Sequence, residues 1–288
     1  MRQIVSILFL VLFGAACQKD DPPAPGPETW EQTFSGALDN WAFDVAADEA
    51  GNLYVLGRYR SASEGLYLLK LDPAGRRLWG TAPLGDERSE AYALHRQPDG
   101  TLIAVGRRYL DDGGSDLAVF ALSEGGDLLW RHSHDQRYLD HGQAVCATAD
   151  GALAVVGYTS AQGAPRDLLV LLLSSDGAFR WSRMLPAGSY DGACAVAAAP
   201  DGGLLVAGAA LNDGDGVDTR FYRLNADGST RWTNDWRKPG FQAPEALLPM
   251  GAGGDFFLVT RDEAESGART YRVTADGRPG QPRHTLAG

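Results

Sequence analysis

Acidic residues beside runs of small, apolar residues are the first candidates for chemistry in this sequence. Asp44, Glu90 and Glu245 each lie in or next to such a run, as does His95. Two carboxyl groups at a defined separation can hydrolyse a glycosidic bond, one as the acid and the other as the base or nucleophile. The neighbouring residues are mostly Ala, Val and Leu, which are typical of packing. We therefore predict no catalytic residues, and keep an enzyme that acts on extracellular polysaccharide as the alternative.

A histidine pair is the first candidate metal site. His132 and His134 are separated by one residue, so a strand would direct both side chains to the same side. Asp135, Asp140 and His141 are close in sequence, and two imidazoles with a carboxylate could hold zinc. The spacing is not specific to a zinc site, because a polar outer strand would have the same pattern.

Aspartates at regular positions are the second candidate. Asp213, Asp215 and Asp218 could offer oxygen ligands to calcium, but the glutamate at the twelfth position of an EF-hand loop is missing. Asp116, Asp167 and Asp218 are spaced 51 residues apart, and aspartates in such places often cap loops by hydrogen-bonding to nearby backbone. We predict a flexible acidic loop and loop caps, and hence no metal and no cofactor.

Aromatic and arginine residues gather in the segments that we expect to be long loops. Binding residues concentrate on such loops, and Tyr, Trp and Arg are common among the residues that dominate interfaces. The residues that we assign to a recognition face are Trp41, Tyr59, Arg107, Arg108, Tyr109, Tyr138, Tyr158, Tyr190 and Trp236, with Arg58 beside them. We expect this face to bind a protein or a glycan. The alternative is that some of the rings, Trp41 above all, only cover the ends of strands.

The elements that must position these residues follow from an internal repeat. Trp79, Trp130, Trp181 and Trp232 are 51 residues apart, and Trp30 lies 49 residues before Trp79. The glycines Gly57, Gly106, Gly157 and Gly208 keep nearly the same rhythm. Asp-Gly pairs between short apolar runs indicate hairpins. In the third copy we predict four strands, at about 143–149, 152–158, 168–173 and 179–185, and we expect the tryptophans to pack between copies.

The repeat resembles the β-propeller repeats of roughly fifty residues that are common in secreted Bacteroidota proteins. The shared features are a small-residue strand, Asp-Gly, an apolar strand that ends in Gly, an Asp that opens the next strand, and then Asp-Gly and Trp. The resemblance implies an all-β, five-bladed β-propeller of four-stranded antiparallel blades over residues 30–288. It says little about activity, because one fold hosts many functions.

The strand that completes the last blade is open between two segments. Residues 31–35 match the stretch that follows each later Trp and could close the ring. Residues 281–286 compete for the same place, although Pro279 and Pro282 make them a weak strand. We expect five blades with one extra edge strand.

The first residues have the pattern of a secretory signal peptide over residues 1–16. Arg2 is followed by an apolar run and then by small residues just before Cys17. This order resembles the lipobox of bacterial lipoproteins, which implies that Cys17 is acylated and becomes the mature N-terminus. Gly14 departs from that pattern, where leucine is usual.

The residues after Cys17 indicate where the protein would go. Lys19, Asp20 and Asp21 resemble the short signal that sends Bacteroidota lipoproteins to the outer face of the outer membrane. Residues 17–29 as a whole are rich in proline and would form an extended tether. We therefore expect a lipid-anchored protein of the outer membrane, at the cell surface.

Charge and cysteine content limit the partners. The formal net charge is −11, the pI is ≈ 4.9, and no Lys/Arg cluster stands out. Nucleic acid is excluded because phosphate backbones need concentrated basic charge, and contact with the membrane is expected through the N-terminal lipid only. Cys146 and Cys194 occupy non-equivalent places in their copies, so we predict two buried free thiols.

These observations predict a non-enzymatic, lipid-anchored surface β-propeller that serves as a binding or scaffold module for a protein or a glycan. Besides the polysaccharide-acting enzyme, an accessory subunit of an outer-membrane protein complex is the remaining alternative. It rests on analogy with other propeller lipoproteins.

Overall fold

The computed structural model of the 288-residue chain is all-β. It describes residues 30–31, 40–60, 64–81, 88–186, 192–211, 217–237, 242–262, 267–280 and 284–287. The chain divides into residues 1–31 and 32–288, and the second part carries the fold. Within the described ranges the one helix is a 3-10 turn, η1 (Gly251–Gly253). No helix in those ranges combines the length and apolar character that crossing a bilayer requires.

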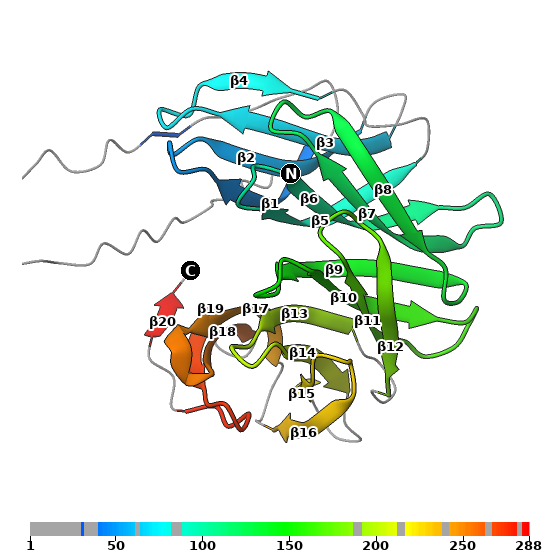
Figure 1. The fold of residues 1–288 in the computed structure, drawn as a ribbon, viewed down its shortest axis with the longest axis vertical. Helices are drawn as coiled ribbons and strands as arrows, with labels where there is room; N and C mark the ends of the chain where they lie inside the picture. The colour runs from blue at the N-terminus through cyan, green and yellow to red at the C-terminus, as the bar shows by residue number, and fades with distance from the viewer. Residues whose placement is uncertain are drawn as a thin grey trace, which may run out of the picture. The chain divides into compact units, whose positions relative to one another are not determined.

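Consecutive strands form antiparallel groups of four (Figure 1). The first group is β1 (Asn40–Ala47), β2 (Leu53–Arg60), β3 (Glu64–Leu71) and β4 (Arg77–Gly80). The second is β5 (Ser89–Arg96), β6 (Leu102–Tyr109), β7 (Ser115–Leu122) and β8 (Leu128–His134). The third is β9 (Leu139–Ala147), β10 (Leu153–Ser160), β11 (Asp167–Leu173) and β12 (Phe179–Leu185). A parallel bridge between Ser115 and Leu139 joins the second and third groups into one sheet.

The last eight strands repeat the pattern. They are β13 (Gly192–Ala198), β14 (Leu204–Leu211), β15 (Val217–Leu224) and β16 (Thr230–Trp236), then β17 (Gln242–Met250), β18 (Asp255–Asp262), β19 (Gly267–Val273) and β20 (His284–Ala287). The predicted four-strand repeat is therefore confirmed, and such groups are typical of propeller blades. Strand β20 takes the fourth place in its sheet and overlaps the segment 281–286 that we considered for it. Of the competing segment, residues 32–35 lie outside the described residues.

Turns of one form join the strands at one end of each group. In the turn after β9, the amide of Gly151 donates to the Thr148 carbonyl at 2.9 Å, and the amide of Thr148 donates to the Ala152 carbonyl at 2.8 Å. Gly151 has φ 78° and Gly177, in the next such turn, has φ 88°. Only glycine adopts these angles without strain, which explains why the Asp-Gly pairs are so regular.

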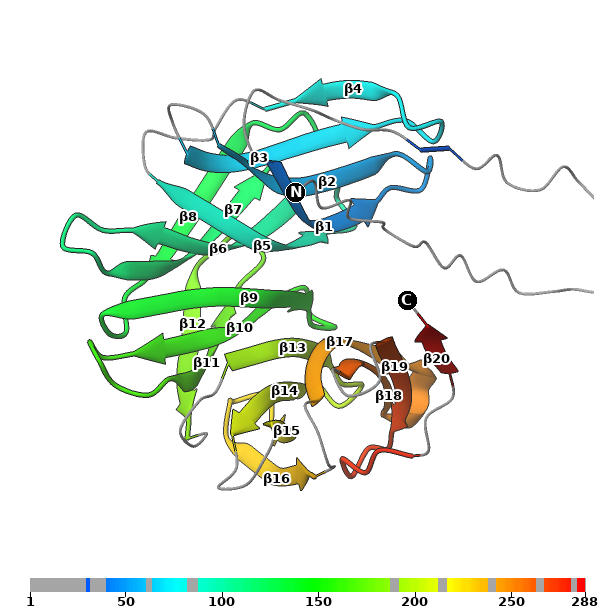
Figure 2. The ribbon, with the colours of Figure 1, turned by 180° about the vertical axis from the view of Figure 1, so that it is seen from behind.

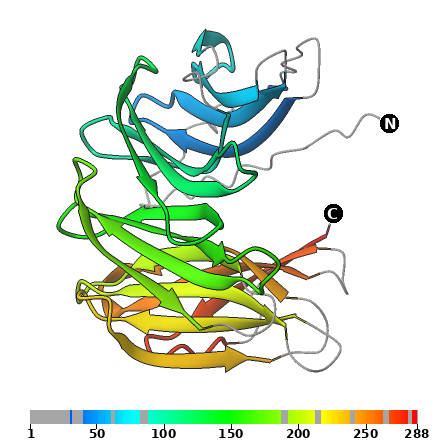
Figure 3. The same cartoon turned by 90° about the vertical axis from the view of Figure 1, so that its right-hand side faces the viewer.

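The hydrophobic core lies between successive groups of strands. Tyr54, Leu68 and Phe120 belong to a cluster shared by the first two groups, with Trp79 packed against it. Equivalent clusters include Trp130, Trp181 and Trp232 in turn. The cluster with Trp232 takes residues from both of the last two groups, which are drawn in yellow to red in Figure 3. The prediction that the Trp series packs between copies is confirmed.

The inner strands β1, β5, β9, β13 and β17 neighbour one another in chain order (Figure 2). Each carries a one-residue bulge near the repeat glycine of the next strand, which leaves the following residues without a cross-strand partner: Phe43, Tyr92, Gln143, Cys194 and Glu245. A Cβ on Gly106 would lie 1.9 Å from the Glu90 carbonyl oxygen, and a Cβ on Gly157 would lie 1.7 Å from that of His141. The glycines therefore recur because the two backbones approach too closely for a side chain. Bulges of this kind redirect side chains. The bulged residues include Phe43, Tyr92 and Glu245, which are larger than the small, apolar residues that we expected along the inner strands.

Candidate functional site

Glu90 on β5 is the centre of the candidate site. Its side chain is only 4% exposed. The carboxylate accepts hydrogen bonds from Arg107 Nε at 3.1 Å and Nη2 at 2.7 Å, and from the Tyr109 hydroxyl at 3.0 Å. Arg58 and the Tyr92 hydroxyl donate to it as well. Charge-assisted bonds are the strong ones among protein hydrogen bonds, so this carboxylate fixes four side chains around it.

The network continues from Arg107 to the next group of strands. Arg107 Nη1 lies 2.7 Å from His141 Nε2, and the Tyr158 hydroxyl lies 2.7 Å from His141 Nδ1. A guanidinium can only donate, so Nε2 is the accepting nitrogen. The proton is therefore on Nδ1, which donates to Tyr158. The two rings also stack, with centroids 4.4 Å apart. We call these residues, Glu90, Arg58, Tyr92, Arg107, Tyr109, His141 and Tyr158, the Glu90 network.

The protonation states of the network follow from its contacts. Burial opposes ionisation of Glu90, but the hydrogen bonds from Tyr92, Arg107 and Arg58 outweigh it and lower the pKa of Glu90 to about 2. Burial, reinforced by the charge of Arg107, lowers the pKa of His141 to about 3. Burial also raises the pKa of Tyr109 to about 12. At neutral pH, Glu90 is therefore ionised and His141 is neutral.

Five residues of the network lie in one cross-strand pair of positions, which the first three copies of the repeat fill with large side chains. Trp41 pairs across the strands with Arg58, Glu90 with Arg107, and His141 with Tyr158. In the fourth copy the same pair is Gly192 with Ala209, and in the fifth it is Ala243 with Arg261. A side chain that the scaffold needed would recur in every copy. These polar and aromatic pairs are therefore particular to one part of the molecule.

Aromatic rings and cations alternate along the edge of the network. The Arg58 guanidinium lies 4.5 Å from the Trp41 ring centroid, and the Arg107 guanidinium lies 4.3 Å from that of Tyr109. Trp41 is 40% exposed and Phe43 is 39% exposed. Cation–π contacts hold a guanidinium flat against a ring. The arrangement thus presents fixed cations beside accessible aromatic surface.

The structure brings together some of the predicted binding residues and not others. Arg107, Tyr109 and Tyr158 belong to the network, and Trp41 lies beside it. Three others have separate contacts: Arg108 pairs with Asp116 at 2.7 Å, the Tyr138 hydroxyl donates to the Asp112 carbonyl at 3.0 Å, and Trp236 packs edge-on against Tyr271 with centroids 4.6 Å apart. The remaining residues lie outside the described part of the chain: Cys17, Lys19, Asp20, Asp21, Tyr190 and the side chain of Tyr59.

Two central members of the network, Tyr92 and His141, were absent from the predicted recognition face. The segments that we expected to be long loops are partly strand: β9 begins at Leu139, which places His141 opposite Tyr158. A signal was available in the sequence. Trp41, Glu90, His141 and Gly192 each precede their repeat glycine by the same number of residues, so they are equivalent positions. The bulge that re-aims Tyr92 is visible only in the strand register.

The candidate catalytic carboxylates have separate partners. Asp44 accepts hydrogen bonds from its neighbour's amide at 2.8 Å and from the Leu94 amide at 2.7 Å, which ties β1 to β5. Burial raises the pKa of Asp44. Glu245 is half exposed and pairs with Arg261 at 3.3 Å. Each of the three acidic side chains is thus engaged by a different set of donors.

The histidine pair does not assemble a metal site with its neighbours in sequence. The rings of His132 and His134 stack with centroids 6.3 Å apart, and His134 stacks on Phe179 at 5.8 Å. Asp140 instead accepts the Gln136 and Arg137 amides at 2.6 and 3.0 Å. Among the described residues, no group of three or more His, Cys, Asp or Glu side chains could hold a metal ion.

The evenly spaced aspartates form a series of ion pairs. Asp116 pairs with Arg108 at 2.7 Å, Asp167 with Arg137 at 2.9 Å, and Asp218 with Arg237 at 3.7 Å. Asp213 and Asp215 lie outside the described residues. Cys146 is a free thiol, and burial raises its pKa to about 12. The side chain of Cys194 is not among those described.

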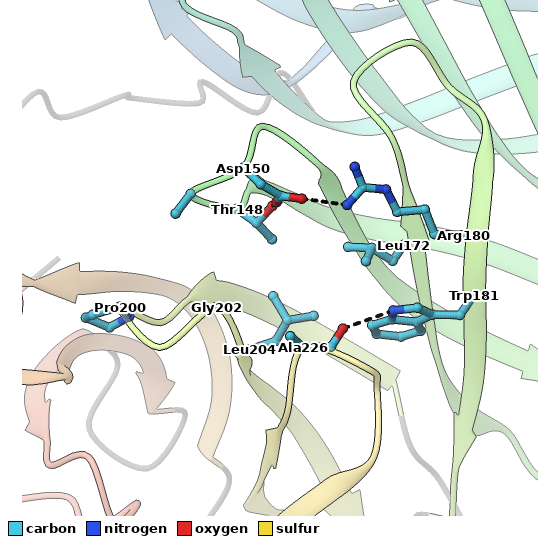
Figure 4. Close-up of a pocket in the computed structure, with 10 residues that line it drawn as sticks. Thr148, Asp150, Leu172, Arg180, Trp181, Pro200, Gly202, Leu204 and Ala226 are labelled. Atoms are coloured by element: carbon cyan, nitrogen blue, oxygen red, sulfur yellow. Dashed lines mark hydrogen bonds and ion pairs between the residues drawn. The ribbon is translucent and has the colours of Figure 1, made fainter.

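A hollow of about 270 Å³ lies at the tight-turn end between the third and fourth groups (Figure 4). Arg180 reaches Asp150 at 2.6 Å across it, and Trp181 Nε1 donates to the Ala226 carbonyl at 3.2 Å. The next copy has an equivalent ion pair, Arg231 with Asp201 at 3.0 Å. Because its walls recur with the repeat, this hollow belongs to the scaffold.

Comparisons with known families agree on the fold. A family model described as outer membrane protein assembly factor BamB matches residues 21–214. A second, described as a β-propeller domain of unknown function, matches residues 199–230. No curated protein matches the chain.

Solved structures of β-rich proteins are similar at low sequence identity. A protein of unknown function from Bacteroides caccae is 15% identical, with a TM-score of 0.54, over 88% of this chain and 84% of that one. One from Dyadobacter fermentans is 14% identical, with a TM-score of 0.52, over 82% and 79%. A GH43 β-1,3-galactosidase solved with galactodeoxynojirimycin is 13% identical, with a TM-score of 0.51, over 84% and 94%. At these identities the likeness concerns the fold alone.

Proposed function

Because the chain belongs to the family described as outer membrane protein assembly factor BamB, we propose that it is a binding module of the cell envelope and not an enzyme. In this proposal it is a five-bladed β-propeller whose Glu90 network forms part of a recognition surface for a protein or a glycan. One observation carries the proposal. The network fills positions that the fourth copy of the same scaffold leaves as Gly192 and Ala209, and rigidly held residues that a fold does not need are typical of binding surfaces.

The state of Glu90 favours binding over hydrolysis. A general acid for glycoside cleavage must hold its proton near the working pH. Glu90 has a pKa of about 2 and is surrounded by donors, so it holds side chains in place instead. Activity on an extracellular polysaccharide, lost in Asp44→Asn, would overturn this assignment in favour of the enzyme.

The proposed surface is tested by partner capture from envelope extracts of the host. The full chain is compared with a variant that combines Arg108→Ala and Tyr109→Ala, and with Arg180→Ala as a control at the tight-turn end. We expect the double variant alone to lose the partner. Because Tyr109 donates to Glu90 and Arg108 pairs with Asp116, its melting temperature is measured to show that it is still folded at the temperature of the capture. Equal capture by all three proteins would contradict the site.

A second candidate function is that of an accessory subunit of an outer-membrane protein complex. The family description is what favours it. Gentle extraction of the native protein should then yield a barrel protein in stoichiometric amount. A clean monomer after the same extraction would count against this role.

We further propose that Cys17 carries the lipid and that Lys19, Asp20 and Asp21 direct the protein to the cell surface. Protease treatment of intact cells tests this, with the three signal residues replaced by alanine. The wild type should be shaved and the variant protected. Protection of both would favour a role inside the envelope.

A further inference from the structure

We infer that the Glu90 network recognises the carboxylate of an acidic sugar residue, with Trp41 and Phe43 packing against the sugar ring. The inference rests on the proposed function, because it names the ligand class of the same surface. Three features of the described residues carry it: local positive charge, unused donors on Arg107 and exposed aromatic rings.

The first feature is the charge of the network in an acidic protein. The chain has a formal net charge of −11. Arg58 and Arg107, whose side chains are 22% and 21% exposed, both bind the single carboxylate of Glu90. Two guanidinium groups thus share one carboxylate, and a third, that of Arg166, lies 4.1 Å from the Tyr158 ring centroid. A half-buried cation of this kind favours an anionic ligand, because its field is only partly screened by water.

The second feature is the set of donors that Arg107 keeps. Its Nε and Nη2 donate to Glu90, and its Nη1 donates to His141. Each terminal nitrogen carries two N–H groups, so one N–H on each has no acceptor among the described residues. Two N–H groups in the fixed plane of a guanidinium match the two oxygens of a carboxylate. Glu90 therefore orients Arg107 and leaves part of its donor set for a ligand.

The third feature is the aromatic surface next to these donors. Trp41 and Phe43 are both on β1 and are the exposed large aromatic residues beside the network. Arg58 lies over Trp41, and Phe43 meets the Tyr92 ring edge-on with centroids 5.3 Å apart. A sugar ring has an apolar C–H face that packs on such rings, while its carboxylate reaches the guanidinium.

The distribution of charge favours an acidic sugar over an acidic peptide. A run of acidic side chains needs a row of available cations. Arg108 pairs with Asp116 at 2.7 Å and Arg137 with Asp167 at 2.9 Å, whereas Arg88 and Arg166 lie over the rings of Tyr109 and Tyr158. The guanidinium groups here thus alternate with flat aromatic rings, which suits a ligand that carries one anionic group on each sugar ring.

Calorimetric titration of the full chain with defined oligomers tests the inference. The probes are an oligomer of galacturonic acid, a neutral galactose oligomer of the same length, and an acidic peptide of glutamates. We expect the acidic sugar to bind about tenfold or more tightly than the neutral one. Trp41→Ala and Arg107→Lys should each weaken its binding by about tenfold, because the first removes the ring and the second removes the planar donor pair.

Arg180→Lys is the matched control, since Arg180 pairs with Asp150 in an exposed ion pair of the scaffold. It should bind as the wild type does, and circular dichroism melting should show that every variant is folded. Equal binding of the two sugars, or no binding of either, overturns the inference. Preference for the peptide also overturns it but leaves the proposed surface standing, whereas unchanged partner capture by the Arg108 and Tyr109 double variant removes the proposed function itself.

Discussion

At the scale of single residues, the most informative feature is a buried carboxylate with a large shift in pKa. Glu90 is ionised because two arginines and two tyrosines surround it, and His141 is neutral because burial and Arg107 disfavour its charged form. Neither group titrates near neutral pH. The charge of the network is therefore constant under physiological conditions, which suits recognition and not proton transfer.

Replacing Glu90 should be costly for stability. Glu90→Gln leaves Arg58 and Arg107 half-buried without their carboxylate, and losing one partner of a buried pair costs about 3 kcal/mol or more. Urea unfolding at neutral pH measures this free energy. Asp150→Asn is the control, because its pair with Arg180 is largely exposed and should contribute less than about 1 kcal/mol. Equal losses for the two variants would contradict the role of Glu90.

The stability of the protein should fall as the pH drops below 6.5. In the unfolded chain His141 takes up a proton near its ordinary pKa of 6.5, whereas in the folded chain it does so only near 3. Glu90 adds a second loss, since its stabilisation is complete above its ordinary pKa of 4.5 and disappears as the pH falls towards 2. Urea midpoints between pH 7 and pH 4.5 should therefore decline less in His141→Gln than in the wild type. His95 and His132, whose pKa values burial also lowers, should contribute to the slope that remains.

At the scale of elements, two kinds of glycine organise each group of strands. Gly106 and Gly157 lie where the bulged inner strand comes too close for a Cβ. Gly126, Gly177 and Gly228 lie in turns with positive φ, against the tryptophan ring of the preceding copy. The repeat thus preserves both the register of the inner strand and the seam between groups.

The two requirements at a turn glycine can be measured separately. Gly177→Ala should destabilise the protein through both its φ of +88° and a Cβ that would lie 2.7 Å from the Trp130 ring. Gly151 has φ +78°, but a Cβ added there would have no atom within 4 Å. Gly151→Ala therefore measures only the cost of the left-handed backbone conformation, about 1 kcal/mol. We expect thermal unfolding to show a further loss of about 2 kcal/mol for Gly177→Ala. Equal effects would mean that the Trp130 ring moves aside freely.

At the scale of the whole domain, the groups at the two ends of the series differ from those in the middle. Strand β10 is buried along its entire length. In β2, Tyr54 and Leu56 are fully buried, whereas Leu53 and Val55 are partly exposed. Among the described residues, hydrophobic clusters join neighbouring groups in chain order, and none joins the last group to the first.

Hydrogen exchange should reveal this difference. Groups that are covered on one face open at a lower free energy than groups covered on both. Amides of β2 and β18 should therefore exchange faster than those of β6 and β10, as measured by mass spectrometry of peptic fragments. Uniform protection along the chain would instead mean that the first and last groups cover each other in solution.

The repeat, the four-stranded groups and the tryptophan seams can all be predicted from the sequence. These depend on local turn chemistry and on regular spacing, which are visible in a single chain. The sequence also placed Arg107, Tyr109 and Tyr158 among candidate binding residues. How these binding residues come together depends on the tertiary structure. Glu90, Tyr92 and His141 contact these binding residues because inner-strand bulges redirect side chains and because separate copies of the repeat pack together. The position of a bulge depends on strand register, which the spacing of residues in the sequence does not encode.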